Sequence, residues 1–315
     1  MSSELPTVER PTAADGNDLD TEPAPSYIGR PSFKEWWKIE WLNFLTLLCL
    51  GGLSVGLSRV PVAFHRPFLL WNTDGSLLSP EFARPDHAYI LNSLNCAIVS
   101  AAIPIAIYLL MFLRIGCFWD LNNAIMGHTT ALLLSQVSHL LAKCLVGGYR
   151  PNFLQACKPD LERDEGIGYA GVYHMPDICT GDPRQIFRES KSWFSGHTAA
   201  ATGAFLFLFL YLNAKLKFWA DHHASLWKLC TSYISLLVIM LISGWVTVDA
   251  AHNWYDSLMG VFVGSLLALF AYRAHYQSIL DWRTNHIPLM PDGRQQIPVS
   301  RGPVFTRQAG WGKRE

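Results

Sequence analysis

The stretch LNSLNCAIVSAAIPIAIYLLMFL, residues 91–113, contains 23 residues without a single Asp, Glu, Lys or Arg. An α-helix of about 20 apolar residues is long enough to cross the hydrocarbon core of a bilayer. We therefore expect this stretch to be a membrane-spanning helix. Further apolar blocks of similar length occur on both sides of it. They cover residues 41–57, 124–146, 198–218, 226–248 and 254–272.

The composition of the chain also indicates a membrane protein. Half of its 315 residues are hydrophobic and 16% are charged, whereas a soluble domain carries ~25% charged residues. The formal net charge is zero, and no long basic run precedes the C-terminal tail, so we expect no nucleic-acid partner. We predict an all-α protein in three parts: a disordered N-terminal tail over residues 1–32, a six-span membrane domain over 33–276, and a basic cytosolic tail over 277–315.

Basic residues beside the apolar blocks predict the orientation of the chain, because cytosolic flanks of membrane helices carry an excess of Lys and Arg. With six spans, most of these residues fall on one side, which places that side and both termini in the cytosol. They include Arg30, Lys34, Lys38, Arg114, Lys215, Lys217, Lys228 and Arg273. The long polar loop over residues 149–194 then faces the lumen or the exterior. A five- or seven-span topology stays open if one block is misjudged.

Two of the seven cysteines, Cys157 and Cys179, share this long polar loop. They can form a disulfide if the loop faces an oxidising compartment, but spacing alone does not fix the geometry of a disulfide, so both states stay open. The chain has no CxxC motif or His/Cys cluster. We therefore expect no metal site and no cofactor.

The first of three polar clusters lies at the end of the third block. Lys143 closes that block, and Arg150 follows the pair Gly147-Gly148. Charged groups at membrane depth are unfavourable and are functional candidates. Two cations that face one compartment suit a phosphate group, which Arg binds as a fork and Lys as a point charge; the alternative is a pair of interfacial cations that reach toward water. His139, one turn earlier, is expected to be a packing residue, with a place in the site as the alternative.

The second cluster opens the fourth block with Ser195, Gly196 and His197. Ser195 is a candidate helix cap, and the backbone N–H groups of a helix N-terminus bind anions. Glycine lets an oxyanion approach the backbone closely, and His197 can transfer a proton near neutral pH. The alternative is an ordinary N-cap with an interfacial histidine.

The third cluster opens the sixth block with His252 and Asp256. Residues four positions apart share one face of a helix. A carboxylate in that position can orient an imidazole and raise its basicity, as in other nucleophile–base sets. The alternative is a structural His–Asp pair.

Together the three clusters resemble the motifs of the type-2 phosphatidic acid phosphatases, or lipid phosphate phosphatases, of the haloperoxidase-like superfamily. The resemblance extends from about residue 41 to 276. The matched positions are Lys143, Arg150 and Pro151 in the first motif, Ser195, Gly196 and His197 in the second, and His252 and Asp256 in the third. Phe194 stands where many members have Pro. The resemblance implies a six-span bundle with the site between the third and sixth helices.

The chain departs from that pattern at the start of the third motif. The family has Ser-Arg there, whereas this chain has Trp245 and Val246. The missing Arg removes a charge-assisted hydrogen bond to the phosphate, worth about 1.5–3 kcal/mol. One hypothesis is that Lys191 or Arg188 takes its place.

The resemblance implies phosphate transfer without a metal ion. His252 would attack phosphorus, and Asp256 would orient it. His197 would protonate the leaving alkoxide and then activate water. The phosphoryl oxygens would be held by Lys143, Arg150, Ser195 and Gly196. The substrate would be a lipid phosphate from the bilayer, such as phosphatidate, lysophosphatidate or diacylglycerol pyrophosphate, entering between Trp245 and Trp254.

Other functions remain open at this point. A lipid phosphotransferase on the same scaffold would pass the phosphoryl group or head to an alcohol, and the missing Arg is compatible with it. A relative that has lost activity and acts through interactions is the second alternative, and a transporter is a weaker third. The sequence names neither the lipid nor the organelle, and it does not predict the oligomeric state.

Overall fold

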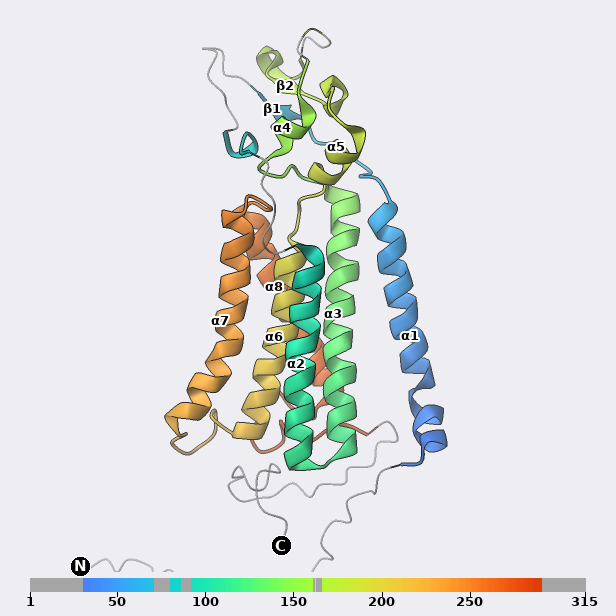
Figure 1. Cartoon of the computed structure of the whole chain (residues 1–315), viewed down its shortest axis with the longest axis vertical. Helices are drawn as coiled ribbons and strands as arrows, with labels where there is room; N and C mark the ends of the chain where they lie inside the picture. Colours follow the sequence, from blue (N-terminus) through green and yellow to red (C-terminus); the bar gives the residue numbers. More distant parts are fainter. Residues whose placement is uncertain (1–30, 71–79, 86–91, 161, 163–165, 291–315) are drawn as a thin grey trace, which may run out of the picture.

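The computed structural model describes residues 31–70, 80–85, 92–160, 162 and 166–290. Within them, six helices are long and apolar enough to cross a membrane, and they stand side by side (Figure 1). These are α1 (Phe33–Arg59), α2 (Ser93–Ile115), α3 (Phe118–Val146), α6 (Gly196–Leu216), α7 (Leu226–Val248) and α8 (Trp254–His275). The all-α, six-span prediction is confirmed. Most of the two predicted tails, residues 1–30 and 291–315, lies outside the described residues.

Two helices begin earlier than the apolar blocks predicted. α1 starts at Phe33 because Ser32 and Glu35 form a capping box, in which each side chain accepts a hydrogen bond from the other residue's N–H group. α3 starts at Phe118 and includes Asp120, which is buried. Polar residues in a first turn hide a helix start from a hydropathy pattern. In α1 they are exposed and capped locally, whereas in α3 the buried Asp120 pairs with Lys215 of α6.

Helix α6 is the centre of the bundle. Nearly all of its side chains are buried, and it packs against α2, α3, α7 and α8. Small residues allow the closest approach: a Cβ at Gly264 of α8 would lie 2.6 Å from the carbonyl oxygen of Ala199 in α6. Close packing over small residues is typical of membrane helix pairs. It holds the N-termini of α6 and α8, which carry two of the predicted clusters, next to each other.

Helix α1 lies at the side of the bundle and packs on α3 (Figure 1). Its buried Glu40 accepts hydrogen bonds from Asn122 Nδ2 of α3 at 2.9 Å and from Asn43 Nδ2 at 2.7 Å. The Trp36 indole N–H donates to Asn122 Oδ1 at 2.9 Å. A polar contact therefore joins α1 to the rest of the protein.

One end of the bundle, called here the loop end, carries the long connection between α3 and α6 (Figure 1). It contains α4 (Phe153–Cys157), α5 (Pro183–Glu189) and a two-stranded antiparallel sheet of β1 (Phe68–Leu69) and β2 (Tyr173–His174). Short 3₁₀ turns lie at Pro80–Phe82, Tyr169–Gly171 and Pro176–Ile178.

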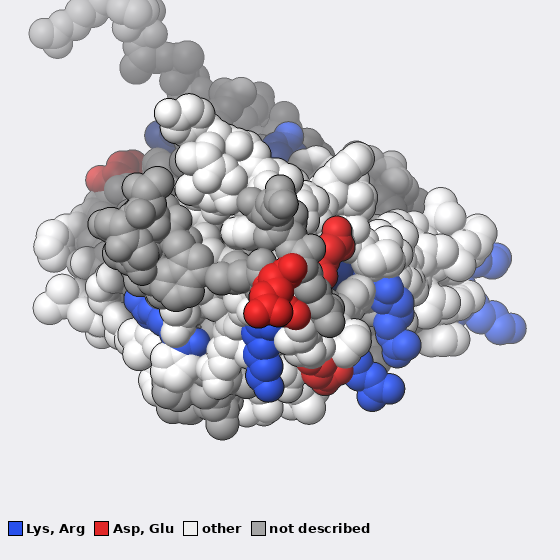
Figure 2. Space-filling model, turned by 90° about the horizontal axis from the view of Figure 1, so that it is seen from above, with Lys and Arg blue, Asp and Glu red and all other residues white. Residues whose placement is uncertain are grey.

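A small core and a disulfide hold the loop end together. Phe68, Tyr149, Phe153 and Ile178 pack in one buried cluster. A disulfide joins Cys157 to Cys179, which answers the question that their spacing left open. Seen from this end, exposed side chains of both charge signs are interspersed (Figure 2).

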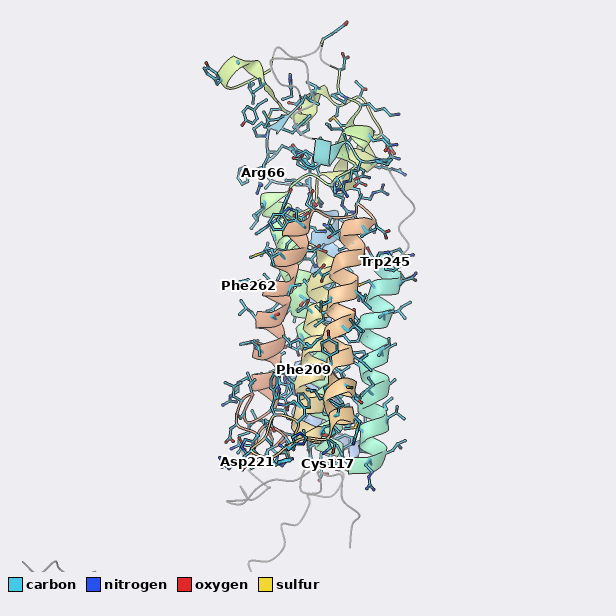
Figure 3. All side chains as sticks on the ribbon, turned by 90° about the vertical axis from the view of Figure 1, so that its left-hand side faces the viewer. Arg66, Cys117, Phe209, Asp221, Trp245 and Phe262 are labelled. Carbon is cyan, nitrogen blue, oxygen red and sulfur yellow. A yellow bond between two sulfur atoms is a disulfide. The ribbon has the colours of Figure 1, made fainter. Side chains whose placement is uncertain are left out.

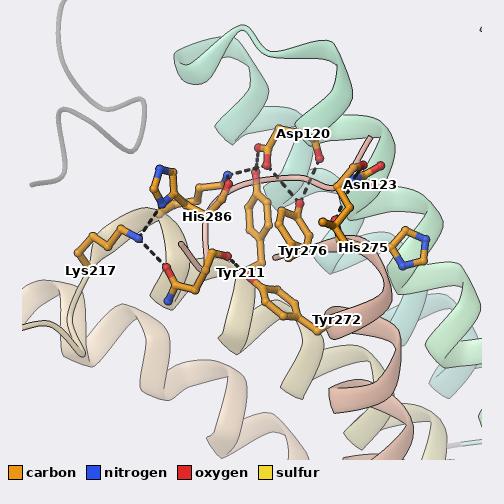
Figure 4. Close-up of polar contacts among 11 residues, drawn as sticks. Asp120, Asn123, Tyr211, Lys217, Tyr272, His275, Tyr276 and His286 are labelled. Atoms are coloured by element: carbon orange, nitrogen blue, oxygen red, sulfur yellow. Dashed lines mark hydrogen bonds and ion pairs between the residues drawn. The ribbon is translucent and has the colours of Figure 1, made fainter. Parts of the chain in front are cut away.

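The opposite end, called here the tail end, holds a buried polar network (Figure 4). Asp120 accepts a hydrogen bond from the Lys215 amine at 2.5 Å and one from the Tyr211 hydroxyl at 3.0 Å. The Lys217 amine donates to Asn285 Oδ1 at 2.5 Å. Residues 277–290 return across this end, so packed structure extends beyond the predicted boundary at residue 276; for example, Leu289 N–H donates to the His275 carbonyl at 2.9 Å.

Candidate active site

The predicted site residues converge at the loop ends of α3, α6 and α8. Lys143, Arg150, Gly196 and His197 line one cavity with a volume of about 130 Å³. The rings of His197 and His252 lie 6.0 Å apart, centre to centre. The Ser195 N–H donates to the Asp256 carbonyl oxygen at 3.1 Å. Three segments that are distant in sequence thus meet in one place.

His252 lies in the turn between α7 and α8 and is buried. Its backbone N–H donates to the Val246 carbonyl at 3.1 Å, which holds the turn against the end of α7. Its Nδ1 lies 3.5 Å from Asp256 Oδ2, whereas its Nε2 has no hydrogen-bond partner in the described part of the chain. Burial lowers the pKa of His252, and the nearby Lys143 and Arg150 lower that pKa further. The imidazole is therefore neutral near pH 7, with Nε2 available as a nucleophile.

Asp256 is held by its position in the first turn of α8. Asn253 and Asp256 form a capping box, in which Asp256 Oδ2 accepts from the Asn253 N–H at 3.2 Å. The Ser192 hydroxyl donates to the same oxygen at 2.5 Å and lies 3.3 Å from His252 Nδ1. Ser192 therefore bridges the His–Asp pair. No spacing in the sequence singled it out, because it comes from the loop before the second motif.

Ser195 caps α6 as predicted. Its Oγ accepts hydrogen bonds from the Thr198 N–H at 3.3 Å and from the Thr198 hydroxyl at 3.1 Å. His197, in the first turn of α6, has its Nε2 3.3 Å from the hydroxyl of Ser93 in α2. The N-terminus of α2 thus forms a wall beside His197, which the motifs did not predict.

His139 lines the cavity. It therefore lies in the site, which was the alternative to the packing role expected from the sequence. A Cβ at position 196 would lie 2.6 Å from His139 Nε2. Only glycine at that position lets the imidazole lie against the start of α6. His139 Nδ1 lies 3.1 Å from the Ser135 carbonyl, which fixes the plane of the ring.

The turn after α3 brings Arg150 back toward Lys143. Gly147 and Gly148 have φ angles of 66° and 103°, a region that favours glycine. The carbonyls of these two glycines accept hydrogen bonds from the N–H groups of Trp193 and Ser192, both at 3.0 Å. The turn within the first motif is therefore bonded directly to the segment that precedes the second motif.

Arg150 is positioned by Glu189 of α5. Arg150 N–H donates to the Glu189 carbonyl at 3.0 Å, and its Nε lies 3.6 Å from Glu189 Oε2. The Glu189 side chain is fully buried and also accepts from Arg188 Nε at 2.5 Å. Lys143 is buried in the last turns of α3 with its side chain at the cavity. The two cations thus lie beside His197.

The residues proposed to replace the missing Arg are engaged elsewhere. Val246 is buried at the end of α7. The Lys191 amine donates to the Val60 carbonyl and lies 4.1 Å above the ring of Phe187. Arg188 binds Glu189. Neither Lys191 nor Arg188 lines the cavity described above.

Trp245 and Trp254 lie on α7 and α8 and are exposed. The Trp245 indole N–H donates to Asp249 Oδ2 at 2.9 Å. Figure 3 shows Trp245 toward the loop end, whereas Cys117 and Asp221 lie at the opposite end. The cavity is lined by residues of α2, α3 and α6 and by Arg150, and by neither tryptophan. The structure therefore does not support an entrance between them.

Comparisons with known proteins agree with this architecture. Lipid phosphate phosphatase 1 of Arabidopsis thaliana is 28% identical over 261 residues, which cover 82% of this chain and 73% of that protein. A PA-phosphatase related-family protein of Dictyostelium discoideum is 28% identical over 257 residues, covering 79% and 72%. Phospholipid phosphatase 2 of Rattus norvegicus is 28% identical over 250 residues, covering 74% and 84%. No solved structure matches the chain.

A sequence profile of the PAP2 superfamily matches residues 124–280. This segment begins within α3 and ends just beyond α8, so it contains all three motifs and the helices that carry them. The resemblance drawn from those motifs is confirmed: the chain carries a domain of the PAP2 superfamily.

Proposed function

We propose that this integral membrane protein is a lipid phosphatase that hydrolyses phosphomonoesters through a phosphohistidine intermediate. The observation that carries the proposal is the convergence of the His252–Asp256 pair, His197 and two cations at one end of a membrane bundle. The names of the relatives, lipid phosphate phosphatase and phospholipid phosphatase, support a lipid phosphate as the substrate.

In the first step, His252 Nε2 attacks phosphorus and the bond from phosphorus to the lipid oxygen breaks. His197 donates a proton to the departing alkoxide. In the second step, His197 accepts a proton from water, the water oxygen attacks phosphorus, and the phosphorus–nitrogen bond breaks to release inorganic phosphate. Asp256 and Ser192 keep the imidazole oriented in both steps.

Charge on the transferring phosphoryl group is stabilised by groups fixed before the reaction. Lys143 and Arg150 supply two positive charges, and the N-terminus of α6 supplies backbone N–H groups beside Ser195 and Gly196. Together these groups provide the charge neutralisation that a metal ion gives in other phosphatases. Val246 leaves one cation fewer than the family pattern has.

We also propose that the loop end faces the lumen or the exterior, with both termini in the cytosol. The disulfide between Cys157 and Cys179 supports this, because disulfides persist in oxidising compartments. In sealed vesicles, a membrane-impermeant maleimide should label a cysteine introduced at Tyr169, which is 94% exposed, only on that side. Labelling from the cytosolic side would reverse the topology.

The function is tested by phosphate release from a panel of lipid phosphates, with detergent-purified protein in EDTA. We expect release by the wild type and none by His252→Ala. If the wild type releases no phosphate but transfers the phosphoryl group from the lipid to an added alcohol such as a diacylglycerol, the protein is instead a phosphotransferase, which Val246 favours. No transfer to either water or an alcohol would leave the non-catalytic relative.

A further inference from the structure

We infer that Gln136 of α3 hydrogen-bonds an oxygen of the lipid backbone next to the phosphoester, and that the substrate class is therefore a phosphate on an oxygen-bearing backbone rather than on a plain hydrocarbon chain. This inference rests on the proposed function and deepens it. Its starting point is that Gln136 lines the same cavity as Lys143, Arg150 and His197.

Three polar side chains of α3 form one stripe along this cavity. Gln136, His139 and Lys143 are spaced by three and four residues, so they lie on one face of the helix. All three line the cavity. At 1.5 Å per residue, the Cα of Gln136 lies about 10 Å farther along the helix axis from the loop end than that of Lys143. The cavity thus runs from the phosphate site toward the middle of the membrane bundle.

The partner of Gln136 is missing from the protein itself. The neighbouring hydroxyls of α3 bond to their own helix: those of Thr129, Thr130 and Ser135 donate to carbonyls one turn earlier, each at 2.8 Å. Among the described residues, the structure gives the Gln136 amide no hydrogen-bond partner. Gln136 is half-buried and lines the cavity, so a molecule bound there can reach its amide. A polar atom of that molecule would supply the partner that the protein does not.

The wall opposite Gln136 leaves room for a lipid backbone. Ala97 of α2 and Ala200 of α6, two small residues, line the same cavity as Gln136. Toward the loop end, the Ser93 hydroxyl lies 3.3 Å from His197 Nε2, where the leaving oxygen of a substrate would accept its proton. A lipid whose leaving oxygen is at His197 would place the next atoms of its backbone between the two alanines and Gln136.

The chemistry of the amide defines the class of lipid. The Gln136 NH₂ group donates to an ester carbonyl, and its oxygen accepts from a hydroxyl or an amine. Glycerol and sphingoid backbones carry such groups close to the phosphoester. An alkyl or isoprenyl phosphate has only hydrocarbon there and leaves the amide unpaired. Sites built to hydrogen-bond a substrate discriminate against analogues that lack the partner group.

The test compares lysophosphatidate with hexadecyl phosphate in mixed micelles, because the second compound lacks the glycerol and ester oxygens. Gln136→Met keeps the length of the side chain and removes its hydrogen-bonding groups. We expect the wild type to prefer lysophosphatidate, and Gln136→Met to reduce that preference by about fivefold to tenfold through KM. Sphingosine 1-phosphate is a third substrate and shows whether a sphingoid backbone is preferred over a glycerol backbone. Farnesyl phosphate is a second substrate that has only hydrocarbon beside the phosphoester.

Two controls separate this inference from the proposed function. Thr130→Val removes a polar group from the same helix outside the cavity and should leave the preference unchanged. Soluble p-nitrophenyl phosphate tests the chemistry alone, and its turnover should be equal in the wild type and in Gln136→Met. Equal wild-type rates on both lipids, or an unchanged preference in Gln136→Met, would overturn the inference while phosphatase activity remains. Absence of turnover on every substrate would overturn the proposed function and the inference with it.

Discussion

The Ser192 hydroxyl donates a 2.5 Å hydrogen bond to Asp256 Oδ2, the same oxygen that lies 3.5 Å from His252 Nδ1. Because 3.5 Å is long for a direct hydrogen bond, the serine completes the link between the carboxylate and the imidazole. In the proposed mechanism Ser192 is a positioning residue.

Replacement of Ser192 by alanine should lower kcat/KM by about tenfold, because a buried carboxylate oxygen loses one of its two hydrogen-bond donors. The carboxylate would then interact more strongly with a protonated His252, so the pKa of His252 would rise and the acid limb of the pH profile would move to higher pH. Ser192→Thr, which keeps the hydroxyl, should restore both values. A lower rate with an unshifted acid limb would assign Ser192 a purely structural role.

The pH dependence of hydrolysis should reflect the lowered pKa of His252. The neutral imidazole is the nucleophile, and burial together with Lys143 and Arg150 keeps it neutral below the usual histidine pKa of about 6.5. Activity should therefore persist as the pH falls through that value and decline only at lower pH. Arg150→Met removes one cation and should move the acid limb upward. Comparing the two proteins on the same substrate cancels the ionisation of the substrate itself, and coincident limbs would contradict the assignment.

Glu189 contacts both Arg150 and Arg188, and variants of Glu189 and Arg188 separate the effects of these two contacts. Glu189→Gln removes the buried charge beside Arg150, whose Nε lies 3.6 Å away, so Arg150 is held less firmly and KM should rise severalfold. Arg188→Gln changes a side chain that is 52% exposed, and exposed ion pairs contribute little. We expect Arg188→Gln to stay near the wild-type KM. Equal effects of the two variants would show that Glu189 does not position Arg150.

Changes in the buried polar network of the tail end should lower the stability of the protein and leave its activity unchanged. Asp120→Asn removes the buried charge that pairs with Lys215 at 2.5 Å, and breaking a buried pair costs about 3–5 kcal/mol. Thermal unfolding in detergent should occur at a clearly lower temperature, while kcat per folded molecule stays unchanged. Asp221→Asn, a half-exposed residue of the same end, is the control and should leave the unfolding temperature unchanged.

The sequence predicted the membrane helices well, because both the lipid-facing and the protein-facing positions of such helices are apolar. It failed at Phe33, where an exposed polar turn is capped locally, and at Phe118, where the buried Asp120 depends on Lys215 of α6. The seven predicted site residues meet because each lies at or beside the end of a helix. At such positions a short sequence motif determines the local backbone geometry. Ser192 and Glu189 were missed, since their roles arise from contacts with distant segments and no local spacing reveals them.

The contact between Glu40 of α1 and Asn122 of α3 has a consequence for how the protein is made. The two residues are separated by 82 positions in the chain, and translation adds roughly 5–20 residues each second. For several seconds, α1 has therefore left the ribosome while Asn122, the partner of Glu40 on α3, is not yet synthesised. The order of synthesis therefore differs from the order of assembly. α1 is made first, but it can pack in its final position only after α3 has been synthesised and inserted.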